Sequence, residues 1–246
     1  FTDVEARAKP QAILATNTSS IPLETIATAL RVPSRLIGLH FFNPVAKMML
    51  VEVVAGRDSD PAIVARGAAF VRAIDKLPLP VKSAPGFLVN RVLAPYLMTA
   101  MRCVDEGLAP EVIDEAAVAF GMPMGPIELA DTVGLDICAA VGRLLDAQAQ
   151  APRALAAHVA AGELGKKTGR GFYAWVNGRV QKQAPANVPT GLGRRLVDPL
   201  VAEAKSALAE GIVGDADLVD AGAIFGAGFA PFRGGPMHYA RSLQTA

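Results

Sequence analysis

The chain has 246 residues, which is enough for one or two domains of ordinary size, each with a hydrophobic core. Its residues are 52% hydrophobic and 19% charged, a balance that excludes a disordered segment and a coiled coil. The 24 basic and 23 acidic residues give a net charge of +1, so no charge excess favours nucleic acid or an acidic membrane surface as a partner.

The two cysteines, Cys103 and Cys138, lie inside apolar helical patterns. This usage favours a reducing compartment over a disulfide scaffold or a zinc site, and we predict a soluble cytoplasmic protein. The longest uncharged apolar stretch, residues 221–232, contains Gly and Pro and is too short to span a membrane. The chain begins at Phe1 without the pattern of a signal peptide, so we expect it to be a fragment of a longer protein.

Short apolar runs alternate with helical patterns between residues 11 and 81, as in an α/β unit. We predict strands over 12–16, 36–41, 50–54 and 80–83, and helices over 22–30 and 61–77. After the Pro-Gly pair at 85–86 we expect helices alone, over 87–106, 110–120, 127–145, 152–163, 194–210 and 215–225. The segment 182–193 is rich in Pro and Gly and is predicted to be a linker.

The later helices repeat the pattern of the earlier ones. Four short segments recur in the same order: Asp105-Glu-Gly-Leu as Ala209-Glu-Gly-Ile, Ile113-Asp114 as Val219-Asp220, Phe120-Gly121 as Phe225-Gly226, and Gly125-Pro126 as Gly235-Pro236. This order predicts an internal duplication of a helical unit, with chance recurrence of short pairs as the alternative.

His40 and Glu52 are the strongest candidates for chemistry. His40 lies near the end of a predicted strand, and Glu52 interrupts an apolar strand on the face of Leu50 and Val54. A buried carboxylate needs a hydrogen-bonding partner, and His40 is the nearest one. A glutamate bound to one ring nitrogen leaves the other free to act as a base, while a buried structural pair is the alternative.

Two further polar residues have both a functional and a structural interpretation. Ser19, in Asn17-Thr-Ser-Ser20, follows the first strand, where α/β sheets bind ligands, but it could equally cap the helix that begins at Pro22. Asn90 lies on the face of Leu93 and Leu97, where its amide must be satisfied by ligand or by backbone.

The basic loop Lys166-Lys-Thr-Gly-Arg-Gly171 could hold a phosphate, although it lacks the spacing of a Walker A loop. His158 lies in an alanine-rich helical pattern without an acidic neighbour, and His238 follows the glycine-rich terminal loop; both are interpreted as structural. No Gly-x-Gly-x-x-Gly motif follows a strand in these residues, so the pyrophosphate site of a Rossmann domain is not expected within them.

Six segments together resemble the L-3-hydroxyacyl-CoA dehydrogenase family over nearly the whole chain. They are Ala15-Thr-Asn-Thr-Ser-Ser20, His40-Phe-Phe-Asn-Pro44, Leu50-Val-Glu-Val-Val54, Pro85-Gly-Phe-Leu-Val-Asn-Arg91, Gly121-Met-Pro-Met-Gly-Pro126 and Leu164-Gly-Lys-Lys-Thr-Gly-Arg-Gly-Phe-Tyr173. The duplicated helical unit is similar to that of the multifunctional α-subunits of fatty-acid oxidation, in which a hydratase domain precedes the dehydrogenase.

The resemblance implies an oxidoreductase of lipid metabolism that uses NAD to oxidise 3-hydroxyacyl-CoA to 3-ketoacyl-CoA in β-oxidation. It implies that His40 is the general base, that Glu52 orients it, and that Ser19 and Asn90 bond the reacting oxygen. It also implies contacts of Ser19, Asn43 and Lys167 with NAD and of Tyr239 with the substrate.

The implied fold class is an α/β remnant of a Rossmann domain followed by an all-α C-terminal domain with a duplicated helical unit. We divide the chain into the C-terminal part of an NAD-binding domain at 1–84, a first helical repeat at 85–180 and a second at 181–246. The isolated fragment is expected to be inactive, and its parent to be a homodimer or a complex with a thiolase subunit. A non-catalytic helical oligomerisation or scaffold module is the alternative.

Overall fold

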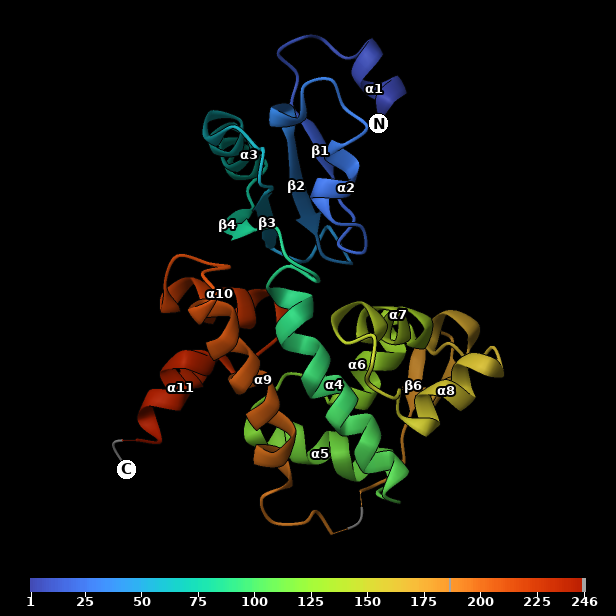
Figure 1. Ribbon diagram of the computed structural model, residues 1–246. Coiled ribbons are helices and arrows are strands. Elements are labelled where there is room, and N and C mark those ends of the chain that lie inside the picture. Colours follow the sequence, from blue (N-terminus) through green and yellow to red (C-terminus); the bar gives the residue numbers. More distant parts are fainter. Residues whose placement is uncertain (186, 245–246) are drawn as a thin grey trace.

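The computed structural model describes residues 1–185 and 187–244, and it separates a sheet region from a helical region (Figure 1). The sheet region contains α1 (Thr2–Arg7), β1 (Leu14–Thr16), α2 (Leu23–Ala27), β2 (Leu36–Phe41), β3 (Leu50–Ala55), α3 (Pro61–Ala73) and β4 (Leu77–Lys82). The helical region contains α4 (Val89–Asp105), α5 (Pro110–Phe120), α6 (Pro126–Val133), α7 (Leu135–Leu145), α8 (Arg153–Ala160), β5 (Ala174–Val176), β6 (Arg179–Gln181), α9 (Leu192–Ala209), α10 (Ala216–Ala227) and α11 (Pro236–Ser242). Short 3₁₀ turns lie at Pro33–Arg35, Lys166–Thr168 and Pro231–Arg233.

The sheet has the strand order β1-β2-β3-β4, in which β1 runs parallel to β2 and β3 parallel to β4. The central pair, β2 and β3, is antiparallel. The strand predicted over 36–41 is confirmed as β2. The strand predicted over 50–54 is confirmed as β3, which extends one residue further, to Ala55. The predicted strand 80–83 is wrong in position, because β4 covers 77–82 and holds Pro78 and Pro80, which an edge strand tolerates since it pairs on one side only.

The two faces of the sheet pack into different cores. Ile37, Leu39, Val51 and Val53 face α3 and form a small cluster with Val71. The alternate residues of β3, Leu50 and Val54, join the main core together with the helical region. Alternation along β3 therefore places Glu52 on the face directed to the helices.

The helix α4 runs from the sheet into the centre of the helical region, with α9 beside it (Figure 1). Helices were predicted over 87–106 and 110–120, and the structure confirms both within two residues. The single helix predicted over 127–145 is wrong: Gly134, with φ of 109°, separates α6 from α7. The predicted helix 61–77 ends at Ala73, because Asp75 adopts a φ of 58° before β4 begins.

The expectation of helices alone after residue 87 is also wrong, since β5 and β6 form a hairpin. Asn177 and Gly178, with φ of 50° and 74°, make the turn. Asn-Gly is the preferred pair for such a two-residue turn, but each strand has only three residues, which is too few for an alternating pattern to predict a strand. Within the described ranges, none of the helices combines the length and hydropathy that a bilayer span requires.

The structure confirms the internal duplication through two buried aspartates. In the first unit, Asp114 accepts hydrogen bonds from the backbone N–H groups of Ile127 and Glu128 at the start of α6, at 2.7 and 3.2 Å. In the second, Asp220 accepts from Met237 and His238 at the start of α11, at 2.6 and 3.1 Å. Each aspartate thus satisfies free donors at the N-terminus of a later helix in its own unit.

The glycine before each of these helices is required by the same contact. A Cβ added to Gly125 would lie 2.2 Å from Asp114, and one added to Gly235 would lie 2.4 Å from Asp220. The repeated Gly-Pro pair therefore reflects close packing of the backbone against a carboxylate.

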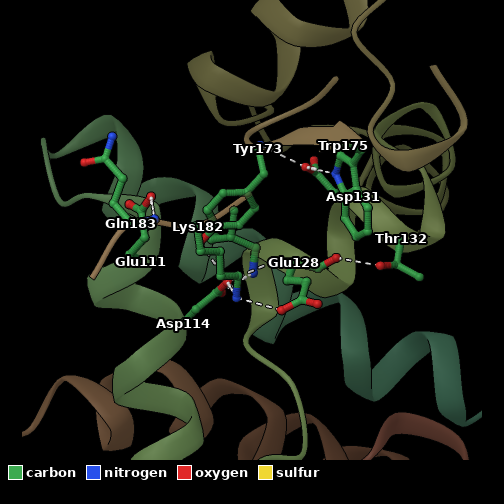
Figure 2. A network of polar contacts seen from close by, with 10 residues as sticks. Glu111, Asp114, Glu128, Asp131, Thr132, Tyr173, Trp175, Lys182 and Gln183 are labelled. Atoms are coloured by element: carbon green, nitrogen blue, oxygen red, sulfur yellow. Dashed lines mark hydrogen bonds and ion pairs between the residues drawn. The ribbon is translucent and has the colours of Figure 1, made fainter. Parts of the chain in front are cut away.

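Asp114 differs from Asp220 in having side-chain donors as well. Its Oδ2 accepts from the Lys182 ammonium and the Tyr173 hydroxyl, each at 2.8 Å (Figure 2). Burial raises the pKa of Asp114, and the ammonium of Lys182 opposes that rise. Lys182 is the first residue of the linker that follows β6, so its ion pair with Asp114 attaches the linker to the first helical unit.

We expect Asp114→Ala to lower the free energy of unfolding by about 3 kcal/mol, since it leaves buried backbone donors and the Tyr173 hydroxyl without their acceptor and leaves the Lys182 ammonium with Glu128 as its one carboxylate partner. Asp220→Ala should cost about 1–2 kcal/mol, because only backbone donors lose their partner. Urea denaturation measures both. The control Glu115→Ala, at an exposed position of α5, should stay within about 0.5 kcal/mol of wild type. An equal loss of unfolding free energy in the two variants would contradict the stabilising role of the side-chain donors of Asp114, Lys182 among them.

Candidate active site

The register of β2 and β3 places His40 directly opposite Glu52. Residues opposite one another in an antiparallel pair project to the same face of the sheet. The Nδ1 atom of His40 lies 2.6 Å from Oε2 of Glu52, which is a short hydrogen bond. The pair that was predicted from the sequence is therefore formed.

Glu52 is fully buried, and each of its oxygens has a partner. While Oε2 faces His40, Oε1 accepts hydrogen bonds from the backbone N–H groups of Leu88 and Val89, both at 2.9 Å. These two residues form the N-terminus of α4, where free N–H groups and the helix dipole favour a negative charge. Three donors thus compensate the cost of burying the carboxylate.

The imidazole of His40 is held on both sides by aromatic rings. The ring centroids of Phe42 and Phe87 lie 4.6 and 5.5 Å from that of His40, in edge-on arrangements. The side chain of His40 is 10% exposed. Among the described residues, its Nε2 atom has no hydrogen-bond partner, so this nitrogen is free to bind a reacting group.

The turn between β4 and α4 adopts an unusual backbone conformation. Phe87 has a φ of 53°, next to Gly86 at 72°. A non-glycine residue in this region costs roughly 1–3 kcal/mol. The conformation directs the following N–H groups to Glu52 and places the Phe87 ring against His40. Sequence reasoning missed Phe87, and the Pro-Gly pair before it was the available signal.

Ser19 and Asn90 are brought together, although 71 residues separate them. The Nδ2 atom of Asn90 donates to Oγ of Ser19 at 3.0 Å. The capping alternative for Ser19 is wrong, because α2 has no side-chain cap. Through this hydrogen bond, Asn90 connects the helical region to the sheet region. Asn90 directly follows Val89, whose backbone N–H donates to Glu52.

Asn17 is a second residue that sequence reasoning did not single out. Its Oδ1 accepts from the backbone N–H of Phe41 at 2.8 Å, which ties the loop after β1 to the end of β2. Since β1 and β2 are parallel, their carboxyl ends lie at one edge of the sheet. Ser19 and His40 are therefore presented at the same edge.

A small cavity of about 40 Å³ begins at Asn90. Its walls come from α4 and from the α6–α7 junction, with Leu93 and Leu97 on one side and Val133 and Ile137 on the other. Cys138 also lines it, and burial raises the pKa of this thiol to about 12. The thiol is therefore protonated at neutral pH and does not serve as a nucleophile.

Within the described residues, no hydrogen bond or ion pair joins Asn43 or Lys167 to His40 or Glu52. Asn43 is exposed, two residues beyond the end of β2, and a cis peptide bond joins it to Pro44. The Nζ atom of Lys167 forms an ion pair with Asp136 in the first turn of α7, at 2.5 and 2.7 Å. This exposed pair holds the Lys167 side chain close to Gly134.

Gly165, directly before the basic loop, and Gly171, at its end, pack against Asp131. This fully buried aspartate accepts from the backbone N–H groups of Phe172 and Tyr173 and from Nε1 of Trp175, each at 3.0 Å (Figure 2). A Cβ on Gly165 or Gly171 would lie 2.2 Å from atoms of Asp131. The loop is therefore shaped by a carboxylate of its own chain.

The remaining candidates lie elsewhere. Tyr239 is buried in an aromatic cluster with Phe120 and Phe229, and no contact joins it to His40 within the described residues. His158, interpreted as structural, has an acidic partner after all, because its Nδ1 lies 2.8 Å from Glu163. His238 contributes its backbone N–H to Asp220.

The arrangement has the parts of a general base. A carboxylate that only accepts hydrogen bonds fixes Nδ1–H of the imidazole, and the lone pair then resides on Nε2. When Nε2 takes a proton, the buried carboxylate stabilises the resulting cation. Hydroxyl and amide groups lie at the same sheet edge, where they can bind an oxygen of the reacting molecule.

Two family models match the chain. The model of the 3-hydroxyacyl-CoA dehydrogenase NAD binding domain matches residues 1–84, and that of the 3-hydroxyacyl-CoA dehydrogenase C-terminal domain matches residues 86–175. The chain is 39% identical over 258 residues to the fatty acid oxidation complex subunit alpha of Shewanella loihica, an alignment that covers 98% of this chain and 36% of that protein. The chain thus spans just over a third of this curated relative.

Solved structures show the same fold. The 3-hydroxybutyryl-CoA dehydrogenase of Escherichia coli K12 aligns with a TM-score of 0.84 at 27% identity, over 99% of this chain and 71% of that one. The (S)-3-hydroxybutyryl-CoA dehydrogenase of Ralstonia eutropha aligns with a TM-score of 0.68 at 38% identity, over 72% of this chain and 65% of that one.

The hydrogen bond to Glu52 predicts the tautomer of His40. In the neutral imidazole, ¹⁵N NMR should show a protonated Nδ1 and an unprotonated Nε2, because a carboxylate cannot donate to the ring. In Glu52→Gln, the amide can present either a donor or an acceptor, so the spectrum should report a mixture of tautomers. An unprotonated Nδ1 in the wild-type protein would rule out the proposed orientation.

Proposed function

Because the chain belongs to the 3-hydroxyacyl-CoA dehydrogenase family, we propose that it supplies the catalytic residues of an NAD-dependent oxidation of 3-hydroxyacyl-CoA to 3-ketoacyl-CoA in fatty-acid β-oxidation. One observation carries the proposal: Glu52 binds His40 through Nδ1, and Nε2 has no partner in the described part of the chain. Nε2 of His158 has no hydrogen-bond partner in the described residues either, but Glu163 is half-exposed, whereas Glu52 is fully buried and His40 shares with Ser19 the sheet edge at the carboxyl ends of β1 and β2. This combination of burial and placement favours the enzyme over a scaffold module.

In this reaction His40 removes the proton of the 3-hydroxyl group through Nε2. NAD, when bound, would supply the hydride acceptor for C3, so that the substrate would lose one proton and one hydride and become the ketone. Glu52 stabilises the imidazolium by accepting from Nδ1–H, and its burial strengthens this interaction. The edge-on rings of Phe42 and Phe87 limit rotation of the imidazole.

Ser19 and Asn90 are proposed to bind the reacting oxygen. Asn90 uses one N–H on Ser19 and keeps a second one. Since Ser19 accepts that bond, its own hydroxyl hydrogen is available to donate. Two donors held by a mutual hydrogen bond are oriented before the substrate arrives, which is the condition for electrostatic stabilisation of the transition state.

The residues present fit the nicotinamide end of NAD. The free Nε2 of His40 and the polar side chains at the carboxyl ends of β1 and β2 are the groups that such a site needs. We propose that Ser19 and Asn43 contact the cofactor from this edge. We propose that Lys167 contacts the cofactor from the helical region. Its ammonium would bind an anionic group of NAD and give up one of its hydrogen bonds to Asp136.

The small cavity at Asn90 is the proposed site for the first carbons of the acyl group. Its walls are mostly apolar, and it begins at a residue that we assign to the reacting oxygen. The substrate contact proposed for Tyr239 has less support, since this side chain packs among aromatic rings of the helical core.

The domain boundaries, partners and location are part of the same proposal. We divide the chain into 1–84, 85–180 and 181–246, because the sheet ends at Lys82 and the second capping aspartate belongs to the later helices. The name of the Shewanella loihica relative describes a subunit of a complex, which supports a second kind of subunit, such as a thiolase. A homodimer is the alternative. Two buried, unpaired cysteines support a cytoplasmic location.

In the full-length protein, His40→Ala should lower kcat for 3-hydroxyacyl-CoA by at least about 100-fold, because the general base is lost. Glu52→Gln should also be severe, since the imidazole loses its orienting carboxylate. Steady-state kinetics at neutral pH measure both. The matched control is His158→Ala, which removes the other His–Glu pair and should change kcat by less than about twofold. Near wild-type turnover in both site variants would refute the assignment.

Ser19→Ala and Asn90→Ala separate catalysis from stability. If these residues bind the reacting oxygen, each substitution should lower kcat/KM by about 10- to 100-fold, the range of a lost transition-state hydrogen bond. The melting temperature of each variant gives the stability in parallel. A lowered melting temperature with unchanged kcat/KM would return both residues to structural roles.

A further inference from the structure

A second and much larger cavity lies along α4, beside the small one. Its volume is about 510 Å³, within the usual range of small-molecule sites. Residues of α4, α7 and α8 form its walls, and Glu203 of α9 closes one side. The reaction proposed above uses only the small cavity at Asn90, so it leaves this volume unexplained.

Two residues, Ala94 and Met98, line both cavities. They lie one helical turn apart on α4, where this helix packs against α7. The small cavity has Ile137, Cys138 and Val141 of α7 as its wall, whereas the large one has Ala139, Gly142 and Arg143. The two cavities are therefore neighbours on opposite sides of the contact between α4 and α7.

The Met98 side chain occupies the gap at this contact. A Cβ added to Gly142 would lie 3.5 Å from Cε and 3.6 Å from Sδ of Met98. Because Gly142 has no side chain, this position of α7 leaves the space next to the thioether unfilled. Methionine has three rotatable bonds and adapts readily to irregular space, so Met98 can turn aside without movement of the helices.

The small cavity alone limits the length of the acyl group. A volume of 40 Å³ holds about three water-sized groups, at 10–15 Å³ each. A longer acyl chain that is bound at Asn90 must continue elsewhere, and the nearest apolar space is behind Met98.

We propose that Met98 is a gate between the two cavities, and that the distal part of a long acyl chain passes it to occupy the 510 Å³ cavity. This inference rests on the function proposed above and names its substrate class: long-chain as well as short-chain 3-hydroxyacyl-CoA. Gly142 is a specificity-determining position, because its missing side chain leaves room for the passage.

The walls of the large cavity suit an acyl chain. Pro95, Leu145 and the fully buried Leu155 supply apolar surface. The most deeply placed cation, Arg91, is neutralised by Glu203 at 2.5 Å and by Glu210 at 2.7 Å. Arg102 and Arg143 are exposed, so their guanidinium groups reach solvent without the cost of burial.

Two substitutions in the full-length protein test the gate. Gly142→Leu should fill the gap against Met98, and its Cβ fits at ordinary contact distance. Ala151→Trp, at an exposed wall position, should fill the large cavity away from the gate. Each should lower kcat/KM for 3-hydroxyhexadecanoyl-CoA by at least about tenfold, yet change kcat/KM for 3-hydroxybutyryl-CoA by less than about twofold.

The control is Ala140→Leu, an exposed position of α7 that lines neither cavity, for which both substrates should behave as with wild type. Calorimetry provides a readout that is independent of turnover. Hexadecanoyl-CoA should bind both variants at least about tenfold more weakly than wild type, whereas butyryl-CoA should bind all proteins equally. Melting temperatures confirm that each variant is folded.

The outcomes separate the two proposals. If the wild-type protein oxidises neither substrate, the proposed function is wrong. If it oxidises only 3-hydroxybutyryl-CoA, or if Gly142→Leu and Ala151→Trp leave the long-chain substrate unaffected, the function stands and the gate is wrong. If Ala151→Trp lowered kcat/KM equally for both substrates, the gate would also be wrong, because Ala151 lines the large cavity and not the small one.

Discussion

The buried carboxylate of Glu52 is the interaction on which the rest of the site depends. A charge without solvent is costly, and here its cost is offset by one imidazole and two backbone donors. These donors come from β2 and from the first turn of α4, so one side chain joins the sheet to the central helix. The strained backbone at Phe87 is tolerated because it brings the N–H groups of α4 to the carboxylate.

Buried carboxylates also organise the helical region, but there they serve the backbone. Asp114, Asp131 and Asp220 each accept two backbone N–H groups from a later segment of the chain. Glycines lie against all three, because a Cβ would overlap the carboxylate. Glu52 differs in having a histidine partner with an unused nitrogen. Burial alone therefore does not distinguish a catalytic acid from a structural one, and the partner's free atom does.

The basic loop at residues 166–171 contains both glycines and cations, and each has a partner or a structural reason within the chain. Gly171 packs closely against Asp131, and Gly169 ends the short 3₁₀ turn with a φ of 79°, so both glycines have a structural explanation without any bound phosphate. Its cations are paired within the chain, since Lys167 binds Asp136 and Lys166 lies 5.4 Å over the Trp175 ring. Only Lys167 is held beside the junction of α6 and α7, near the cavity that starts at Asn90.

The sequence by itself determined the pairing of His40 with Glu52, the strands that carry them and the duplication of the helical unit. These depend on local patterns, such as a carboxylate in an apolar strand or ordered repeats, which one chain displays without further information. The break at Gly134 and the hairpin at 174–181 were missed, because local periodicity continues across them or is too short to detect. Only the tertiary structure joined Ser19 to Asn90 and placed Met98 between two cavities, since contacts between residues far apart in the chain depend on how helices pack, and spacing along the sequence does not record that packing.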